Sequence, residues 1–464
     1  MIDGLHPYPE INPSGVEWLP SLPVGWEIHR AKYSFQEADD WSETGDEELL
    51  SVSHKTGVTP RSQKNITMFM AESYAGHKVC RPGDIVVNTM WAWMAAIGVS
   101  RHIGIVSPAY GIYRPRNTNR FEPKYLDYLL RTEVYRAEYL RSSRGITTSR
   151  LRLYPPDFLN IPFVQPPLEE QRLIVRFLDW HGGQTTKLIR EKKKIIALLN
   201  EQKQAIIHRA VTRGLDPNVR LKPSGVSWVA EIPEHWQMLP NRAFLKKRKL
   251  LVGEAHHDFQ LLSLTKQGVI VRDVDSGKGK FSADMGTSQV VNAGDIIFCL
   301  FDIPETPRTV GLSLHAGMIT GAYTVFSFSG RVDPNFIELF YIAMDDRKLL
   351  GPLYTGLRNT IAPSRFIGVK TPVPPLQEQI SIVQAVQATT AEMNATISTI
   401  EKEVSLIQEF QTRLIADVVT GKLDVRAAAA KLPEITEFEP IDDLAEDDDP
   451  DEALYDAENE EVAA

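Results

Sequence analysis

Arginine, threonine, serine and asparagine gather around glycine in two short stretches of this sequence. The first covers residues 141–152 (Arg-Ser-Ser-Arg-Gly-Ile-Thr-Thr-Ser-Arg-Leu-Arg), and the second covers residues 354–360 (Tyr-Thr-Gly-Leu-Arg-Asn-Thr) with Arg365 close behind. Arginine forms paired hydrogen bonds with guanine, asparagine does so with adenine, and hydroxyl groups bind phosphate or base. We therefore expect two DNA-contacting loops, with the candidate residues Arg144, Thr147, Thr148, Arg150, Arg152, Thr355, Arg358, Asn359 and Arg365.

A second basic group lies upstream in both halves of the chain, at residues 54–64 and from residue 265 onward. Its candidate DNA-contacting residues are Lys55, Arg61, Lys64, Lys266, Arg272, Lys278 and Lys280. A solvated surface charge explains any single one of them nearly as well as a contact does, so the prediction rests on the clusters. Trp91 and Trp93 form a third candidate, although packing in the fold is the better explanation for tryptophan.

These clusters belong to a sequence that is written twice. Residues 13–18 (Pro-Ser-Gly-Val-Glu-Trp) return as residues 223–228, and residues 166–171 (Pro-Pro-Leu-Glu-Glu-Gln) return as residues 374–379. The repeat distance of about 210 residues is far longer than a solenoid unit and is the size of a domain. The chain is therefore predicted to be a covalent pseudo-dimer, which suits a bipartite target.

Each repeat begins with short alternating runs separated by turn residues, which predict an α+β domain. A Gly-Asp pair precedes a strand candidate in both halves, so Asp84 and Asp295 are expected to be turn residues rather than catalytic acids. A short amphipathic helix with proline in its first turn follows at residues 122–130 and 333–341.

A long helix closes each repeat, starting at residues 169 and 377. Its apolar residues show the 4-3 spacing of a coiled-coil seam. The first helix also contains His181, Gly182 and Gly183, which are expected to kink or open it. A homodimer zipper or a generic bundle core would give the same stripe. Because the duplication supplies a partner of equal length, we expect the two helices to pair, antiparallel if a dyad relates the halves. The seam residues are Leu178, Ile189, Ile196, Leu199, Ile206, Val386, Met393, Ile397, Ile400, Val404, Ile407 and Leu414.

Composition limits the class of protein further. The 464 residues allow two or more domains, and the net charge of −9 conceals a basic body. Residues 431–464 hold fifteen acidic residues against one lysine, a local charge of −14 that leaves +5 for the rest. The tail is expected to be disordered, and the body can approach phosphate. The only two cysteines, Cys80 and Cys299, exclude a disulfide framework and a zinc cage.

Motifs for catalysis are missing from the sequence. The string closest to an amino-methyltransferase motif, residues 154–158 (Tyr-Pro-Pro-Asp-Phe), lacks the amide or carboxylate before the prolines, and no phosphate-binding loop has the right spacing. We expect no catalytic, cofactor-binding or metal-binding residues. Two alternatives are a single-chain recognition–methylation enzyme, which the missing motifs oppose, and a tandem protein-binding adaptor, which would need no basic loops. We also expect a cytoplasmic protein without a membrane span or secretory signal.

One family combines these features. Two Gly-Val-x-Trp stretches with a second Trp downstream, two Gly-Asp strands and two Pro-Pro-Leu-x-Glu-Gln helix starts resemble, in this order, the specificity subunit of type I restriction–modification systems. The resemblance covers residues 13–424 and implies two tandem target recognition domains in a pseudo-twofold arrangement, separated by two long helices that form an antiparallel coiled coil. The expected boundaries are 1–165 for the first recognition domain, 166–215 for the first helix, 216–373 for the second recognition domain, 374–424 for the second helix and 425–464 for the acidic tail.

The resemblance also implies a function and a set of partners. The family's subunit is non-catalytic and reads a bipartite, asymmetric sequence in double-stranded DNA. It carries two modification subunits, which methylate adenine, and restriction subunits, which act as motor and nuclease, join for cleavage. S-adenosylmethionine, ATP and magnesium are then used by the partner subunits, and this chain itself is expected to hold no cofactor.

Overall fold

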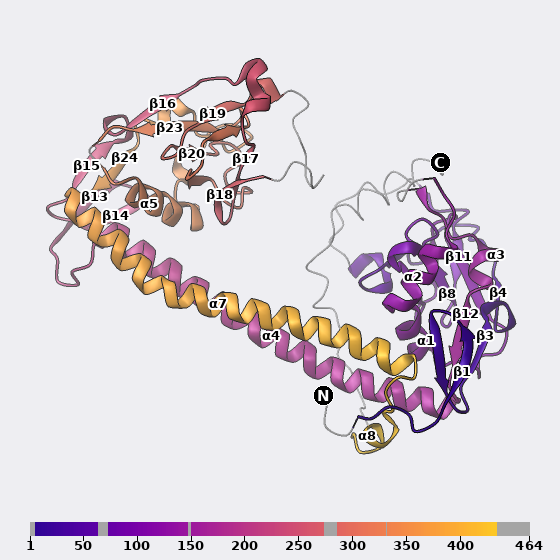
Figure 1. Cartoon of the computed structure of the whole chain (residues 1–464). Coiled ribbons are helices and arrows are strands. Elements are labelled where there is room, and N and C mark those ends of the chain that lie inside the picture. Colours follow the sequence, from indigo (N-terminus) through magenta and orange to yellow (C-terminus); the bar gives the residue numbers. More distant parts are fainter. Residues whose placement is uncertain (1–4, 64–72, 147–149, 273–284, 331, 434–464) are drawn as a thin grey trace. The chain divides into compact units, whose positions relative to one another are not determined.

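The computed structural model describes residues 5–63, 73–146, 150–272, 285–330 and 332–433 (Figure 1). It divides into two compact units. Unit 1 combines Met1–Lys192 with Lys402–Ala464, and unit 2 is Lys193–Glu401. Unit 1 is therefore built from two distant parts of the sequence, whereas unit 2 is continuous.

Unit 1 consists of short antiparallel strands and short helices. Its strands are β1 (Ile11–Val16), β2 (Leu19–Pro23), β3 (Glu27–Arg30), β4 (Phe35–Glu37), β5 (Leu50–Ser53), β6 (Gly57–Pro60), β7 (Lys78–Cys80), β8 (Ile85–Val87), β9 (Ile97–Val99), β10 (Gly104–Val106), β11 (Gly111–Pro115) and β12 (Pro162–Gln165). Its short helices are α1 (Pro123–Leu130), α2 (Glu133–Ser142), α3 (Pro155–Leu159) and α8 (Arg426–Ala430). The largest sheet has the order β4-β11-β8-β9, and the remaining strands pair as β1–β2, β3–β12, β5–β6 and β7–β10.

Unit 2 repeats this arrangement strand for strand. Its strands are β13 (Leu221–Val226), β14 (Val229–Pro233), β15 (Gln237–Pro240), β16 (Leu245–Arg248), β17 (Leu262–Thr265), β18 (Gly268–Val271), β19 (Gln289–Val291), β20 (Ile296–Phe298), β21 (Val310–Leu312), β22 (Gly317–Ile319), β23 (Thr324–Phe328) and β24 (Lys370–Val373), and its short helices are α5 (Pro334–Asp346) and α6 (Pro363–Phe366). The largest sheet has the order β16-β23-β20-β21, and the pairs are β13–β14, β15–β24, β17–β18 and β19–β22. The predicted duplication and the α+β class are confirmed.

Two long helices contribute to both units: α4 (Leu168–Arg213) and α7 (Leu376–Val419). Segments of the two lie side by side in each unit (Figure 1). In unit 1, Lys192 Nζ lies 2.6 Å from Glu403 Oε2, and Gly182 lies opposite Gln411. In unit 2, Lys203 Nζ donates to Asn394 Oδ1 at 3.0 Å. Positions rise along one helix as they fall along the other, so the predicted antiparallel pairing is confirmed.

The residues of the predicted seam are shielded from solvent to different degrees. Leu178, Ile189, Val386, Ile397 and Leu414 are buried, and the other seam residues are half-buried. The kink or opening predicted at residues 181–183 does not interrupt the helix, which is continuous from Leu168 to Arg213. The small Gly182 is instead buried against α7.

Each Gly-Asp pair forms the expected turn. Gly83 and Gly294 adopt φ values of +92° and +89°, which favour glycine. The following carboxylate closes the turn, because Asp84 accepts from the Arg81 amide at 2.9 Å and Asp295 accepts from the Asn292 amide at 2.8 Å. Each carboxylate also pairs with an arginine of its own sheet. These contacts agree with the expectation that Asp84 and Asp295 are turn residues rather than catalytic acids.

The last residue of the Pro-Pro-Leu-x-Glu-Gln motif makes the same contacts in both units through its buried side-chain amide. Gln171 Oε1 accepts from the Glu122 amide at 2.8 Å, while its Nε2 donates to the Pro166 carbonyl at 2.7 Å. Gln379 repeats both bonds with the Asp333 amide and the Pro374 carbonyl, each at 2.8 Å. Each glutamine therefore ties the start of a long helix to the start of α1 or α5, the two short helices predicted from the sequence.

Both ends of each long helix belong to the cores of the units. The large core of unit 1 contains Phe177 of α4 and Val418 of α7, and that of unit 2 contains Val211 of α4 and Ile382 of α7. Beyond α7, Val425 and Ala429 are also buried in unit 1. The disorder expected from residue 425 therefore does not include residues 425–433, because α8 has an apolar face that the core covers. Residues 434–464, which carry nearly all of the acidic charge, lie outside the described residues.

Replacing Gln379 by alanine should destabilise unit 2 by about 2–4 kcal/mol, because the half-buried Asp333 amide and the buried Pro374 carbonyl both lose their partner. Gln377→Ala, in the exposed first turn of the same helix, is the matched control and should change stability by less than about 0.5 kcal/mol. Chemical denaturation followed by circular dichroism measures both. Equal midpoints for the two variants would contradict the role given to Gln379.

Candidate functional site

In unit 2, the predicted loop is a tight turn closed by its own backbone. The Thr355 amide donates to the Thr360 carbonyl at 2.9 Å, and the Thr360 amide donates back at 3.0 Å. Gly356 and Asn359 take left-handed φ values of +72° and +44°. The hydroxyl groups of Thr355 and Thr360 also donate to carbonyls of the turn, whereas the side chains of Leu357 and Arg358 are exposed. Arg358 is exposed over 68% of its side chain.

Arg358 is nevertheless held in place. Its Nε lies 3.1 Å from Asp302 Oδ1, its Nη2 pairs with Asp302 Oδ2, and its guanidinium stands 5.3 Å from the centre of the Phe301 ring. The Asp302 amide also donates to the Arg358 carbonyl at 2.8 Å. The hydrogen bonds from Arg358 hold the pKa of the Asp302 carboxyl below its ordinary value, so the pair is ionised at neutral pH. The turn is thus joined to the loop that follows β20.

Unit 1 has the corresponding arrangement. Arg144 and Arg152 exchange both backbone hydrogen bonds at 2.9 Å, and Ile146 between them is fully exposed. Arg144 Nη2 lies 2.5 Å from Asp157 Oδ1 on α3, and 71% of the Arg144 side chain is exposed. The Leu153 amide donates to the Thr89 carbonyl at 2.9 Å, which joins this loop to the one that follows β8. The two predicted loops therefore occupy equivalent places in the repeat.

The remaining loop candidates have less defined surroundings. Arg150 and Arg152 are exposed in the loop of unit 1, and Arg365 is exposed on α6 beyond the turn of unit 2. Thr355 is exposed at the start of that turn. Thr147 and Thr148 lie outside the described residues, so their prediction stays a prediction.

The upstream basic groups lie on two equivalent hairpins, β5–β6 and β17–β18. Lys55 and Lys266 are exposed at the hairpin turns, whereas Arg61 and Arg272 are half-buried beyond the second strand of each hairpin. Each hairpin packs against the edge strand that follows the loop after β8 or β20, since β6 neighbours β9 and β18 neighbours β21. The hairpin and the basic loop of each unit are thus connected through one edge strand. Lys64, Lys278 and Lys280 lie outside the described residues.

The tryptophans after β8 are only partly accounted for by packing. The rings of Trp91 and Trp93 are stacked, with centroids 5.8 Å apart and an interplanar angle of 17°. Trp93 Nε1 donates to the Met90 carbonyl at 2.9 Å. Both side chains are half-buried. They stand in the loop that Thr89 joins to the basic loop of unit 1.

Sequence reasoning missed the acidic members of the site. Asp157 lies within residues 154–158, which the sequence relates only to an incomplete methyltransferase motif. Its partner, Arg144, is 13 positions away. Asp302 and Arg358 are 56 positions apart. No local spacing connects either pair. The loop of unit 1 that corresponds to the Asp302 loop, residues 88–96, contains no aspartate, so the repeat gives no signal for these partners either.

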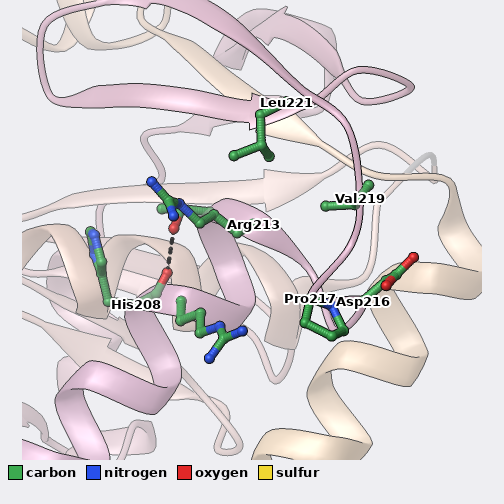
Figure 2. Close-up of a pocket in the computed structure, with 8 residues that line it drawn as sticks. His208, Arg213, Asp216, Pro217, Val219 and Leu221 are labelled. Carbon is green, nitrogen blue, oxygen red and sulfur yellow. Dashed lines mark hydrogen bonds between the residues drawn. The ribbon is translucent and has the colours of Figure 1, made fainter.

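Unit 2 also contains a pocket of about 440 Å³ at the end of α4 (Figure 2). Its lining is one continuous stretch of chain and comprises His208, Arg209, Thr212, Arg213, Asp216, Pro217, Val219 and Leu221. Thr212 Oγ1 donates to the His208 carbonyl at 2.6 Å, and Arg213 pairs with Glu231 at 3.3 Å. Burial and the nearby charges of Arg347 and Arg213 lower the pKa of His208. The pocket shares no residue with the basic turn or hairpin of unit 2.

The described part of the chain contains no group of three or more His, Cys, Asp or Glu side chains placed to hold a metal ion. None of its helices is both long enough and apolar enough to cross a membrane.

Comparison with known proteins gives one consistent answer. A putative type I restriction enzyme specificity subunit of Methanocaldococcus jannaschii, MjaX, is 26% identical over 325 residues, which cover 68% of this chain and 71% of the relative. The StySPI specificity subunit of Salmonella potsdam is 23% identical over 344 residues, or 70% of each chain. This chain is similar in sequence to type I specificity subunits over about two thirds of its length. No family model matches it.

The fold agrees with this relationship. A chain from a solved type I R-M system, studied for complex assembly and conformational transition, superposes with a TM-score of 0.58. The match covers 86% of this chain and 98% of that one at 15% identity, so it bears on the fold alone. The type I specificity resemblance inferred from the repeated motifs is confirmed.

Substitution of Asn359 tests whether the stability of the turn depends on the left-handed conformation at this position. Asn359→Gly should keep the melting temperature, because glycine adopts a positive φ without strain. Asn359→Val should lower stability by about 1–2 kcal/mol, because a β-branched residue is strained there. Thermal unfolding of the two variants provides the measurement. A valine variant as stable as the glycine variant would show that residue 359 does not need the left-handed conformation.

Proposed function

We propose that this chain is the DNA sequence-recognition subunit of a type I restriction–modification complex. Each unit reads one half of a bipartite, asymmetric target in double-stranded DNA. The chain carries no catalytic activity of its own. It presents the target to two modification subunits that methylate adenine, and restriction subunits join them for cleavage.

The observation that carries this proposal is the recurrence of one device in both units. At equivalent places in the repeat, a backbone-closed loop exposes an arginine, Arg144 in unit 1 and Arg358 in unit 2. Arginine is the side chain most often used to read guanine in the major groove. The flanking hairpins add lysine and arginine that are suited to phosphate, and the chain outside residues 431–464 has a net charge of +5.

The two units are expected to read different half-sites. Unit 2 offers Thr355, Arg358 and Asn359 on a short turn, whereas unit 1 offers Arg144, Arg150 and Arg152 on a longer loop. Different donors at equivalent places select different bases. An asymmetric target follows from this difference.

Cofactors and location belong to the same proposal. S-adenosylmethionine, ATP and magnesium are used by the modification and restriction subunits, and this chain binds none of them. Acting on the DNA of the cell, the complex works in the cytoplasm.

Replacing Arg358 by alanine should relax one base in one half-site. Loss of a paired contact to guanine reduces discrimination at that base by roughly ten- to a hundredfold, and the other half-site stays intact. The measurement is methylome sequencing of cells that express the chain together with its modification subunit. Arg144→Ala is the matched variant and should relax the other half-site.

Two results would contradict the proposal. A uniform loss of methylation over both half-sites would mark Arg358 as a phosphate contact or a folding residue. Transfer of labelled methyl groups from S-adenosylmethionine by the purified chain alone would show that it is itself an enzyme.

The paired helices are proposed to space the two half-sites. Four residues lengthen a helix by about 6 Å and add about 1.1 turns, so a four-residue insertion nearly preserves the phase of the seam. Four residues inserted at both Ala197 and Ser398 should therefore change the length of the unread gap while both half-sequences stay the same. A base pair advances roughly 3.4 Å, so a step of this size is resolved by methylome sequencing.

A two-residue insertion at the same positions is the control. It would rotate Leu199 and Ile206 away from the interface and should prevent stable pairing. A folded, active four-residue variant that keeps the original gap would show that the helices do not set the spacing.

A further inference from the structure

Each proposed DNA-reading arginine is paired with a carboxylate of its own unit. Arg358 pairs with Asp302, which is 56 positions away, and Arg144 pairs with Asp157, which is 13 positions away. The carboxylates come from different elements: Asp302 follows β20, and Asp157 lies on α3. The two units therefore form the same kind of arginine–carboxylate pair at equivalent loops, with the carboxylate supplied by different elements. This recurrence suggests a role for the pair in both units.

In unit 2 the pairing leaves a defined part of the arginine unoccupied. Asp302 engages Nε and Nη2, the side edge of the guanidinium. A guanidinium has five N–H donors in a planar fork, so the donors of Nη1 and the second donor of Nη2 point away from the carboxylate. This end fork matches the two acceptors, O6 and N7, that guanine presents in the major groove.

Asp302 is itself fixed independently of the arginine side chain. It adopts a left-handed φ of +47°, and its carbonyl accepts from the Thr306 amide at 2.9 Å and from Thr306 Oγ1 at 2.8 Å. Its amide donates to the Arg358 carbonyl at 2.8 Å. The carboxylate is therefore a preformed support, and the Phe301 ring on the same loop limits the arginine from another side.

The charge of the pair also favours a base over the DNA backbone. An isolated arginine attracts any phosphate, but Arg358 and Asp302 together carry no net charge. Asp302 is 30% exposed, so a phosphate that approaches Arg358 also meets a carboxylate. A guanine edge is neutral and meets no such repulsion.

We propose that Asp302 and Asp157 are positioning residues for sequence recognition. Each orients its arginine toward a base edge, and Asp302 also weakens the capture of Arg358 by phosphate. The inference rests on the proposed function, because it assumes that Arg358 and Arg144 read bases.

The test compares Asp302→Asn with Arg358→Ala in the complete complex with the modification subunit. Asparagine has the shape of aspartate and tolerates the left-handed conformation, so the loop should keep its fold. Asp302→Asn should lower discrimination about tenfold at the base that Arg358→Ala relaxes, and it should strengthen binding to non-target duplex about two- to fivefold. In the Arg358→Ala background the same change should have no further effect on discrimination.

Two controls separate positioning from a general effect on folding. Asp157→Asn should relax the half-site that Arg144→Ala relaxes and leave the half-site of unit 2 unchanged. Asp346→Asn breaks another arginine–carboxylate pair of unit 2, to Arg308 at 2.9 Å, and should leave base preference unchanged at both half-sites. Methylome sequencing and titration of target and non-target duplexes provide the readouts, with thermal melting as the check of folding.

The outcomes are distinguishable. If Arg358→Ala relaxes one base and Asp302→Asn does not, the positioning role is overturned while the proposed function stands. If Asp302→Asn tightens target binding without changing base preference, the carboxylate is a competitor of DNA rather than a support, and the inference is likewise overturned. If Arg358→Ala leaves the methylome unchanged, the base contact in the proposed function fails first.

Discussion

The structure depends on the need of each long helix to bury an apolar seam that it cannot bury alone. Within each unit, a segment of α4 lies antiparallel to a segment of α7 and covers that seam. Since the two segments are far apart in sequence, neither unit can complete its core from one stretch of helix. Unit 1 must recruit the C-terminal part of the chain, where Val418, Val425 and Ala429 are buried. The duplication thus yields units whose cores depend on both copies of the helix.

Polar groups connect this helical pairing to the strand-rich parts of the two units. A long helix that starts beside a domain must satisfy its first backbone groups, and so must the short helix next to it. Gln171 and Gln379 join the two helix starts with a single side chain, because Oε1 accepts from the amide just before the short helix and Nε2 donates to a carbonyl just before the long helix. Leaving these backbone groups without a hydrogen-bond partner would lower the free energy of unfolding. Gln171 and Gln379 therefore fix how the start of each long helix meets its domain. The loops that carry the exposed arginines are built on those domains.

Backbone hydrogen bonds also shape the candidate interface. Both loops close on themselves through paired backbone bonds, which leaves the side chains of Arg144 and Arg358 to the surface. A neighbouring carboxylate then limits the directions in which each guanidinium can point. Rigid presentation lowers the entropy lost when a contact forms, and this favours discrimination between bases over simple attraction to phosphate. A fold made of short strands and turns can therefore support a selective surface.

The sequence alone determined the duplication, the α+β class, the seam of the helices and the positions of the basic loops, because these depend on local periodicity and on motifs that occur twice. The opening expected at residues 181–183 is absent, since α4 is continuous there and Gly182 is buried against α7, and the disorder expected at residues 425–433 is absent because the core of unit 1 covers α8. The carboxylate partners Asp302 and Asp157 were decided only by tertiary structure. The pairing over 56 positions in unit 2 results from tertiary packing of the turn at residues 355–360 against the loop after β20, where the Ile361 amide also donates to the Leu300 carbonyl at 2.8 Å. No local pattern in the sequence records that contact.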